Sequence, residues 1–265
     1  METQVLLSSV VTLPSLPTAF LWAAQLGFHG LELFPHRRTE PAAVDRLARQ
    51  YNMPVKGIHI PFWWKTKSLW QVIKSEYLVR EKLFAGVWWV LFGPGHEDCP
   101  AVQLLKKFPQ AYCLLHPDTY GQSLGQHQFF LGHEVFLENE RPKQGESTFT
   151  YDPLQIKSSL LPCLGALAGR LMFDPGHVLP AQEAGILEKR SIPEWYELLK
   201  PHGLHLSFSG EGRLHDLPTE DEWRSLALVI TQYPPQVIVV ETAPGFGAYE
   251  RVRTARHMLQ WNLGI

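Results

Sequence analysis

Short apolar runs alternate along the chain with segments in which apolar residues recur at helical spacing. The apolar runs that we predict as strands are Gln4–Val10, Gly30–Pro35, Val55–Pro61, Tyr112–His116, Glu134–Asn139, Leu171–Phe173, Leu204–Phe208 and Val237–Val240. The segments that we predict as helices are Pro17–Leu26, Pro41–Tyr51, Ala101–Phe108, a short piece around Ser123–Leu131, Pro153–Leu167, Ile192–Leu199, Glu220–Gln232 and Tyr249–Trp261. This alternation, with strands that are apolar nearly throughout, indicates a parallel sheet covered by helices.

A long segment after the third strand decides how many strands there are. Ser68–Phe92 is compatible with one long helix, or with a helix followed by a strand over Val87–Phe92. The first choice gives eight strands and a closed (β/α)8 TIM barrel, with strand four ending at His116 rather than at the loop that begins with Gly93. Nine strands would not close that barrel. No linker divides the chain, so we predict one α/β domain over residues 1–265.

Acidic and imidazole side chains stand at the ends of most of these strands. In a TIM barrel the carboxyl ends of all strands open into one active-site mouth, so these side chains would meet there. The residues are His59, His116, Glu138, Asp174 with His177, His205 and Glu241. Any one of them alone is more often a hydrogen-bonded structural group, but so many carboxylates would repel one another unless a cation neutralised them. Mixed oxygen and imidazole ligands suit zinc, manganese, iron or cobalt better than calcium.

The stretch Leu171–His177 combines three features of such a site. Three apolar residues predict a buried strand, Asp174 stands at its end, and His177 follows after the pair Pro175-Gly176. Asp-Pro and Pro-Gly are ordinary turn dipeptides, so we expect a turn or loop here that carries two metal-capable side chains. Glu32 in the second strand is placed to reach the same mouth, where it would orient a metal ligand.

Composition limits the classes of partner and compartment. The 265 residues are 45% apolar with a formal net charge of −2, which gives no general attraction to nucleic acid or to an anionic membrane, although it does not exclude a local basic groove. We expect no membrane association, because no apolar run approaches the roughly 20 residues that span a bilayer. The start of the chain lacks a signal-peptide pattern, and three unpaired cysteines fit a reducing cytoplasm.

Short motifs through nearly the whole chain give these observations a family context. The motifs are Gly27–Glu32, Gly57–Phe62, Leu115–Pro117, Leu137–Asn139, Phe173–His177, Leu204–Leu206 and Val240–Thr242. Each is unspecific alone, but their order and spacing resemble the xylose isomerase-like TIM barrel superfamily. That superfamily holds sugar isomerases and epimerases as well as endonuclease IV, of AP endonuclease family 2.

In the isomerase and epimerase branch, the resemblance implies one metal and a proton-transferring pair. The residues that match its four metal ligands are Glu138, Asp174, His205 and Glu241. Glu138 and Glu241 would also exchange a proton next to the sugar carbonyl, whose oxygen the metal polarises. His177 and Arg213 match residues that bind substrate oxygens. Separately, Trp63 and Trp64 follow His59 closely and are candidates for an aromatic wall over a sugar, or for helix packing.

In the endonuclease IV branch, the resemblance implies up to three zinc ions. The first would be held by His59, His116 and Glu138, and the second by the four residues of the isomerase site. The third uses an imidazole that matches His177 together with an Asp-x-His element. Here that element is Arg213-Leu214-His215, and a guanidinium cannot ligate a metal, so His215 is left as a possible further ligand and a third zinc is disfavoured.

We therefore predict an enzyme that uses a divalent metal (Mn, Zn, Co or Mg) to isomerise or epimerise a small sugar or sugar phosphate. The alternative is an endonuclease IV-like zinc phosphodiesterase acting at abasic sites in DNA, which the near-neutral charge and Arg213 disfavour without excluding. A lyase using the same enolate chemistry stays open. A degenerate barrel that only binds ligands would be expected to lack a metal ligand, and none of the four central ones is missing. The oligomeric state is not predicted.

Overall fold

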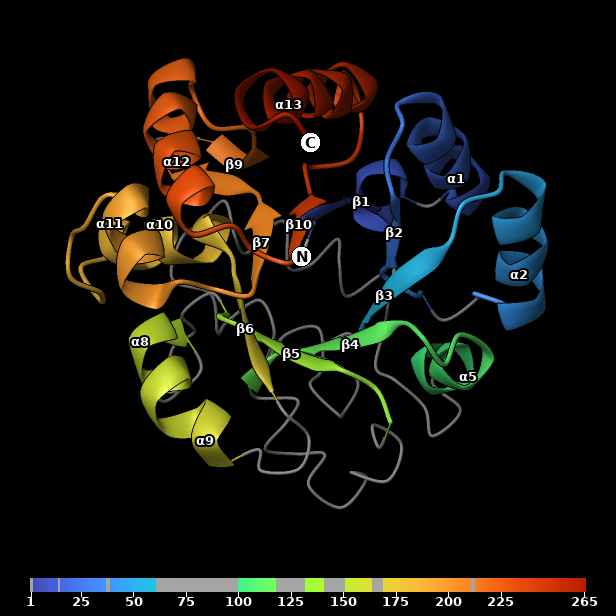
Figure 1. The fold of residues 1–265 in the computed structure, drawn as a ribbon, viewed down its shortest axis with the longest axis horizontal. Coiled ribbons are helices and arrows are strands. Elements are labelled where there is room, and N and C mark those ends of the chain that lie inside the picture. Colours follow the sequence, from blue (N-terminus) through green and yellow to red (C-terminus); the bar gives the residue numbers. More distant parts are fainter. Residues whose placement is uncertain are drawn as a thin grey trace.

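Eight parallel strands close into a barrel in a computed structural model of the chain, which confirms the predicted TIM barrel (Figure 1). The structure describes residues 2–13, 15–36, 39–60, 100–117, 132–140, 151–163, 169–210 and 213–265. Around the barrel the hydrogen-bonded order is β1 (Gln4–Ser8), β10 (Val237–Val240), β7 (Gly203–Leu206), β6 (Arg170–Phe173), β5 (Val135–Glu138), β4 (Tyr112–Leu115), β3 (Val55–His59) and β2 (Gly30–Leu33), which pairs again with β1.

The fourth strand of the barrel is β4, so His116 follows its end as predicted. The barrel closes with eight strands from the described residues, which agrees with the choice of eight over nine. The alternative strand Val87–Phe92 and the Gly93 loop lie outside the described residues, as do the predicted helical segments Ser68–Phe92 and Ser123–Leu131. The single domain over residues 1–265 stays a prediction.

Helices lie around the ring of strands (Figure 1). They are α1 (Leu16–Gln25), α2 (Pro41–Gln50), α5 (Pro100–Lys107), α8 (Pro153–Gln155), a π-helical turn (Ile156–Leu160), α9 (Leu161–Cys163), α10 (Pro175–Glu183), α11 (Ile192–Leu199), α12 (Glu220–Gln232) and α13 (Ala248–Leu263), with a 3₁₀ turn over Ser9–Thr12. The bounds of α11 and α12 are those predicted. Each of these two helices begins at a capping box. Ser191 with Glu194, and Thr219 with Glu222, satisfy the free N–H groups of the two first turns.

Apolar side chains form two layers, one inside the barrel and one between the strands and the helices. The inner layer consists of Leu6, Tyr112, Leu114, Phe136, Met172, Val237 and Val239. Because strand side chains alternate between the two faces, the next inward position after this layer belongs to the residue at or just beyond each strand's carboxyl end. Gly57 makes room for the inner layer, since a Cβ on this residue would lie 2.3 Å from the Tyr112 ring.

Two elements after the sixth and seventh strands differ from the prediction. The turn expected at Asp174–His177 is instead the start of α10, with Asp174 as N-cap and Pro175 in the first helical position. The signal was readable, because Asp-Pro is a good helix start as well as a turn. The strand predicted to run from Leu204 to Phe208 ends at Leu206, and Phe208 begins a hairpin that was not predicted, β8 (Phe208–Gly210) paired with β9 (Arg213–Asp216).

Candidate metal centre

Seven of the eight barrel strands deliver a carboxylate or imidazole to the position just above the inner layer. These side chains are Glu32, His59, His116, Glu138, Asp174, His205 and Glu241, and none is more than 5% exposed. The predicted convergence of strand-end residues is therefore observed, and Glu32 belongs to it. Groups of this kind are almost never fully buried unless they are paired or bind a cation.

Four of these residues form the group that we call the central cluster, comprising Glu138, Asp174, His205 and Glu241. They come from four strands that are neighbours in the barrel, β5, β6, β7 and β10. The Nδ1 atom of His205 lies 2.8 Å from Glu138 Oε1, 3.8 Å from Asp174 Oδ2 and 3.7 Å from Glu241 Oε2. One imidazole nitrogen is thus surrounded by three carboxylates.

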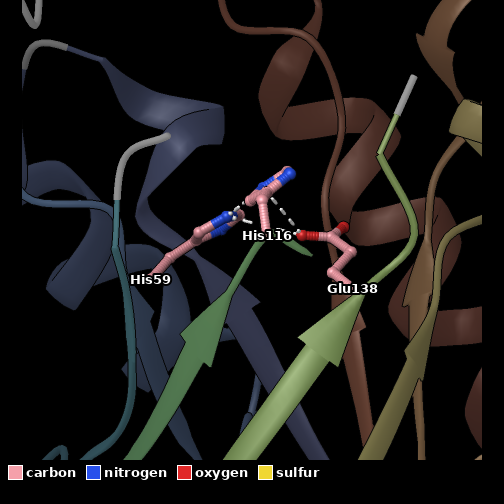
Figure 2. Close-up of side chains that lie close together, drawn as sticks. All are labelled: His59, His116 and Glu138. Carbon is pink, nitrogen blue, oxygen red and sulfur yellow. Dashed lines mark hydrogen bonds and ion pairs between the residues drawn. The ribbon is translucent and has the colours of Figure 1, made fainter. Parts of the chain in front are cut away.

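A second group, the histidine cluster, consists of His59, His116 and Glu138. Figure 2 shows the three side chains pointing toward one another from β3, β4 and β5. The Nε2 atoms of the two histidines are 2.8 Å apart, and Glu138 Oε2 lies 3.4 Å from the first and 3.2 Å from the second. Glu138 therefore belongs to both clusters, with one carboxylate oxygen directed to each.

Several buried atoms of the central cluster form no hydrogen bond within the described part of the chain. They are both carboxylate oxygens of Glu138, Oδ2 of Asp174, Nδ1 of His205 and Oε2 of Glu241. Glu138 Oε1 and His205 Nδ1 are close enough to bond but are not aligned for it. Leaving such atoms unsatisfied costs roughly 1–3 kcal/mol each. Three carboxylates and one imidazole fit a divalent transition metal, and the ligand atoms of Glu138, Asp174 and His205 lie within 4.8 Å of one another.

The electrostatics of the metal-free cluster point the same way. Burial raises the pKa of Asp174 well above its usual value, and the charges of Glu138 and Glu241 add to the rise. Burial and the neighbouring Glu138 likewise raise the pKa of Glu241. For Glu138, burial is outweighed by His205 and His116, which lower its pKa well below the usual range. Burial alone would lower the pKa of His205, but Glu138 and Glu32 raise it well above normal. One imidazolium offsets a single negative charge among the three carboxylates of the central cluster, whereas a divalent cation would offset two.

Asn139 holds Asp174 in place. Its Oδ1 accepts a hydrogen bond from the backbone N–H of Asp174, and its Nδ2 donates to the backbone carbonyl of the same residue, both at 2.9 Å. The Oδ1 atom of Asp174 accepts from the Gly176 N–H at the start of α10, which leaves Oδ2 to the cluster. Asn139 was part of a sequence motif, but its bridging role depends on the pairing of β5 with β6, which the sequence does not show.

His177 and His215 lie together beside the central cluster, with ring centroids 5.9 Å apart. The Nδ1 atom of His177 is 2.7 Å from the carbonyl of Asn139, so it carries the proton that this acceptor needs, and Nε2 lies 3.6 Å from Asp174 Oδ2. His215 sits on β9 with φ +45°, and its Nδ1 is 2.9 Å from Ser207 Oγ and 3.8 Å from Glu241 Oε1. The unpredicted hairpin is what brings His215 to the site.

Two predicted substrate contacts are not tested. Trp63 lies outside the described residues, and Arg213 is described only through its backbone in β9. Their roles stay predictions. Tyr112 was missed as a site residue, although it occupies the inward position four residues before His116, and its hydroxyl donates to Glu32 at 2.7 Å.

No protein-family model matches the chain, and no curated protein matches it. Solved structures do. D-allulose 3-epimerase from Methylomonas sp., in complex with D-allulose, matches with a TM-score of 0.63 at 12% identity over 98% of this chain and 97% of its own. An L-ribulose 3-epimerase matches at 0.62, with 10% identity over 99% and 95%. Endonuclease IV from Thermus thermophilus matches at 0.52, with 16% identity over 97% and 99%.

Identities this low establish the fold alone, which is that of the xylose isomerase-like TIM barrel proteins. Both branches expected from the sequence motifs are represented among these structures, since epimerases, endonuclease IV and an AP endonuclease of family 2 share it. In the part of the chain that the structure describes, no helix is long and apolar enough to cross a bilayer.

Proposed function

We propose that this chain is a divalent-metal-dependent isomerase or epimerase of a small sugar or sugar phosphate. The observation that carries the proposal is the placement of Glu138 and Glu241. Their carboxylates come from β5 and β10, which are separated in the barrel by β6 and β7, and both approach Nδ1 of His205, at 2.8 and 3.7 Å. Two carboxylates arranged around one cation position can serve proton exchange next to a carbonyl, one removing the proton and the other returning it.

In this proposal Glu138, Asp174, His205 and Glu241 hold the cation, whose identity among Mn, Zn, Co and Mg is open. When bound, a divalent cation takes up the negative charge that develops on a substrate carbonyl as the adjacent carbon loses its proton. Glu138 and Glu241 remove and return that proton. Because Nδ1 of His177 carries the proton, Nε2 is the acceptor of that ring, and in this proposal it accepts from a substrate hydroxyl. Arg213 and Trp63 bind the substrate as well.

The structural relatives support a carbohydrate substrate. D-allulose 3-epimerase, which was solved with its sugar, and L-ribulose 3-epimerase have the same barrel over nearly their whole length. The formal net charge of −2 fits a small neutral or phosphorylated sugar more easily than a nucleic acid.

A second candidate function is phosphodiester hydrolysis at abasic sites in DNA, as in an endonuclease IV-like zinc enzyme. The specific observation in its favour is the histidine cluster, because His59, His116 and Glu138 could hold a second cation that shares Glu138 with the first. Two cations close together are a common arrangement for phosphodiester hydrolysis. Against it stands Arg213, at the position where a third zinc would need an aspartate.

The deciding experiment counts metal ions and follows the two reactions in parallel. Protein loaded with Mn²⁺ or Zn²⁺ is incubated with ketoses in deuterated water, and with a DNA duplex that contains an abasic site. We expect deuterium in the sugar with wild-type protein and with the control Glu134→Gln, on the exposed residue just before β5, and none with Glu138→Gln or Glu241→Gln. Exchange that survives both site changes would refute Glu138 and Glu241 as the proton-transfer pair, and chelator-sensitive DNA cleavage would support the second candidate.

A further inference from the structure

Glu32 contacts histidines of both clusters from the far side of their rings. It is fully buried on β2, and its Oε1 lies 3.2 Å from Nε2 of His205 and 3.7 Å from Nδ1 of His59. Its Oε2 accepts a hydrogen bond from the Tyr112 hydroxyl at 2.7 Å and lies 3.4 Å from the same His205 nitrogen. One carboxylate is therefore in contact with His205 of the central cluster and His59 of the histidine cluster.

The two nitrogens of each ring have different surroundings. In His205, Nε2 lies next to Glu32 and Nδ1 next to Glu138, Asp174 and Glu241. A neutral imidazole has a proton on one nitrogen and a lone pair on the other, and an ionised carboxylate can only accept a hydrogen bond. When a cation lies among the three carboxylates, Nδ1 must offer it a lone pair, so the proton of metal-bound His205 belongs on Nε2, toward Glu32.

In His59 the two ring nitrogens have exchanged roles compared with His205. Its Nδ1 lies on the side of Glu32, and its Nε2 lies 2.8 Å from His116 and 3.4 Å from Glu138. The ring is packed against Phe34, at 4.6 Å between centroids, and stacked on His116 at 5.0 Å, so its two nitrogens cannot easily exchange places. At 3.7 Å the distance between Glu32 Oε1 and His59 Nδ1 is longer than a hydrogen bond, so this contact is weaker than the one to His205.

We propose that Glu32 is a positioning residue shared by both metal positions: it holds the ring proton of His205 on Nε2 and that of His59 on Nδ1, which directs a lone pair of each ring into its cluster. The inference rests on the proposed metal centre. Tyr112 supports it by donating to Oε2 of Glu32, the oxygen that also lies 3.4 Å from His205 Nε2, and so holds the carboxylate beside that ring. Carboxylates in this outer position orient metal-bound histidines and raise their basicity.

The test measures zinc affinity with a competing chelating indicator and compares Glu32→Gln with wild type. Glutamine keeps the shape but carries an amide that can donate to Nε2 of His205, which would move the ring proton to Nδ1 and block the ligand atom. We expect zinc to bind roughly 10–100-fold more weakly at the central cluster, the usual cost of losing an outer partner. The loss at the histidine cluster should be smaller, because the contact with His59 is longer.

One background change separates the clusters, and two further variants serve as controls. His116→Gln removes a ligand of the histidine cluster only, so zinc that remains bound reports the central cluster, and adding Glu32→Gln to it measures the effect there alone. Glu134→Gln, at an exposed glutamate that contacts Arg170, should leave both affinities unchanged. Glu32→Asp keeps the acceptor, and it should retain more affinity than Glu32→Gln if charge rather than shape matters.

Nitrogen-15 spectra of the histidine rings in zinc-loaded protein give a second readout. Wild type should show His205 with its proton on Nε2 and none on Nδ1, and in Glu32→Gln at the same zinc concentration a larger share of the rings should carry a proton on Nδ1. A residue with only a structural role would change the unfolding temperature but neither the tautomer nor the zinc affinity. If the zinc affinity of the central cluster in Glu32→Gln stays within about threefold of wild type, the inference is overturned. Wild-type protein that binds no zinc or manganese would instead overturn the metal centre and, with it, the inference.

Discussion

Oε1 of Glu138 lies 2.8 Å from Nδ1 of His205, and neither atom makes a hydrogen bond within the described residues. Two buried polar atoms this close normally bond to each other, because an unsatisfied buried group is costly. Here the two atoms are close enough to bond but do not meet the angles of a hydrogen bond. That is the arrangement of two ligands of one cation, and the other oxygen of Glu138 faces His59 and His116 in the same way.

Glu138→Gln should therefore weaken metal binding more than a change at any other single residue of the centre. An amide offers one weak acceptor in place of two anionic oxygens, and Glu138 is common to both clusters. We expect a loss larger than the roughly 10–100-fold that removal of an outer partner causes. Elemental analysis after dialysis against a weak chelator measures it. Retention of the wild-type metal content would show that Glu138 is not a shared ligand.

The metal-free protein should become less stable as the pH rises from 5 to 8. Folding raises the pKa of Asp174, Glu241 and His205, so each group binds its proton more tightly in the folded state. The stability that each contributes is complete below its unfolded pKa and is lost as the pH rises through its folded pKa. The pKa of Glu138 is lowered and that of Glu32 falls to about 2, so their contributions change only below about pH 4.5 and are constant in this window.

Urea unfolding in the presence of a chelator tests the direction of this pH dependence. We expect the free energy of unfolding to fall by roughly 1–3 kcal/mol between pH 5 and pH 8, and added Mn²⁺ or Zn²⁺ to reduce or reverse the fall. In Asp174→Asn the amide cannot titrate, so the metal-free variant should depend less on pH. A chelated wild-type protein that is more stable at pH 8 than at pH 5 would contradict the raised pKa values.

Asn139→Ala should destabilise the fold and disturb the metal centre together. The change removes two buried hydrogen bonds to the backbone of Asp174 and leaves a buried N–H and a buried carbonyl to find new partners. Each broken bond costs about 1–3 kcal/mol. Thermal unfolding and zinc titration measure the two effects. Asn262→Ala is the matched control, since its amide is exposed on α13 and, among the residues that the structure describes, donates to the carbonyl of Met258 alone, so little should change.

The barrel and most of the cluster residues could be predicted from sequence because both follow from periodicity. Apolar runs fix the strands, alternation fixes which side chains point inward, and a parallel barrel brings every strand end to one mouth. His59, His116 and Glu138 meet for that reason, although they are far apart in the sequence.

What could not be predicted depends on relations across the sheet or on ambiguous local signals. The two contacts of Glu32 with different histidines follow from strand pairing, which one sequence does not reveal. The hairpin that carries His215 has three- and four-residue strands, too short for a periodic signal. The Asp174-Pro175 pair fits a turn and a helix start equally well, and the helix formed because the Asp174 carboxylate caps it.

Gly176→Ala tests how closely the start of α10 approaches Ser207, the residue between β7 and β8. On an unobstructed helix, alanine would stabilise the protein by about 1 kcal/mol relative to glycine. At Gly176, however, a Cβ would lie 2.6 Å from Ser207 Oγ and 2.9 Å from Asp174 Oδ1, so we expect destabilisation, by roughly 1–3 kcal/mol, and weaker metal binding as Asp174 is displaced.

Urea unfolding of Gly176→Ala, Ser207→Ala and the double variant measures the contact. Removing the Ser207 hydroxyl should restore part of the lost stability, because the nearest obstacle is gone while the carboxylate remains. If Gly176→Ala is as stable as wild type, the start of α10 can move away from Ser207 at no cost. The position of Asp174 would then not depend on this contact.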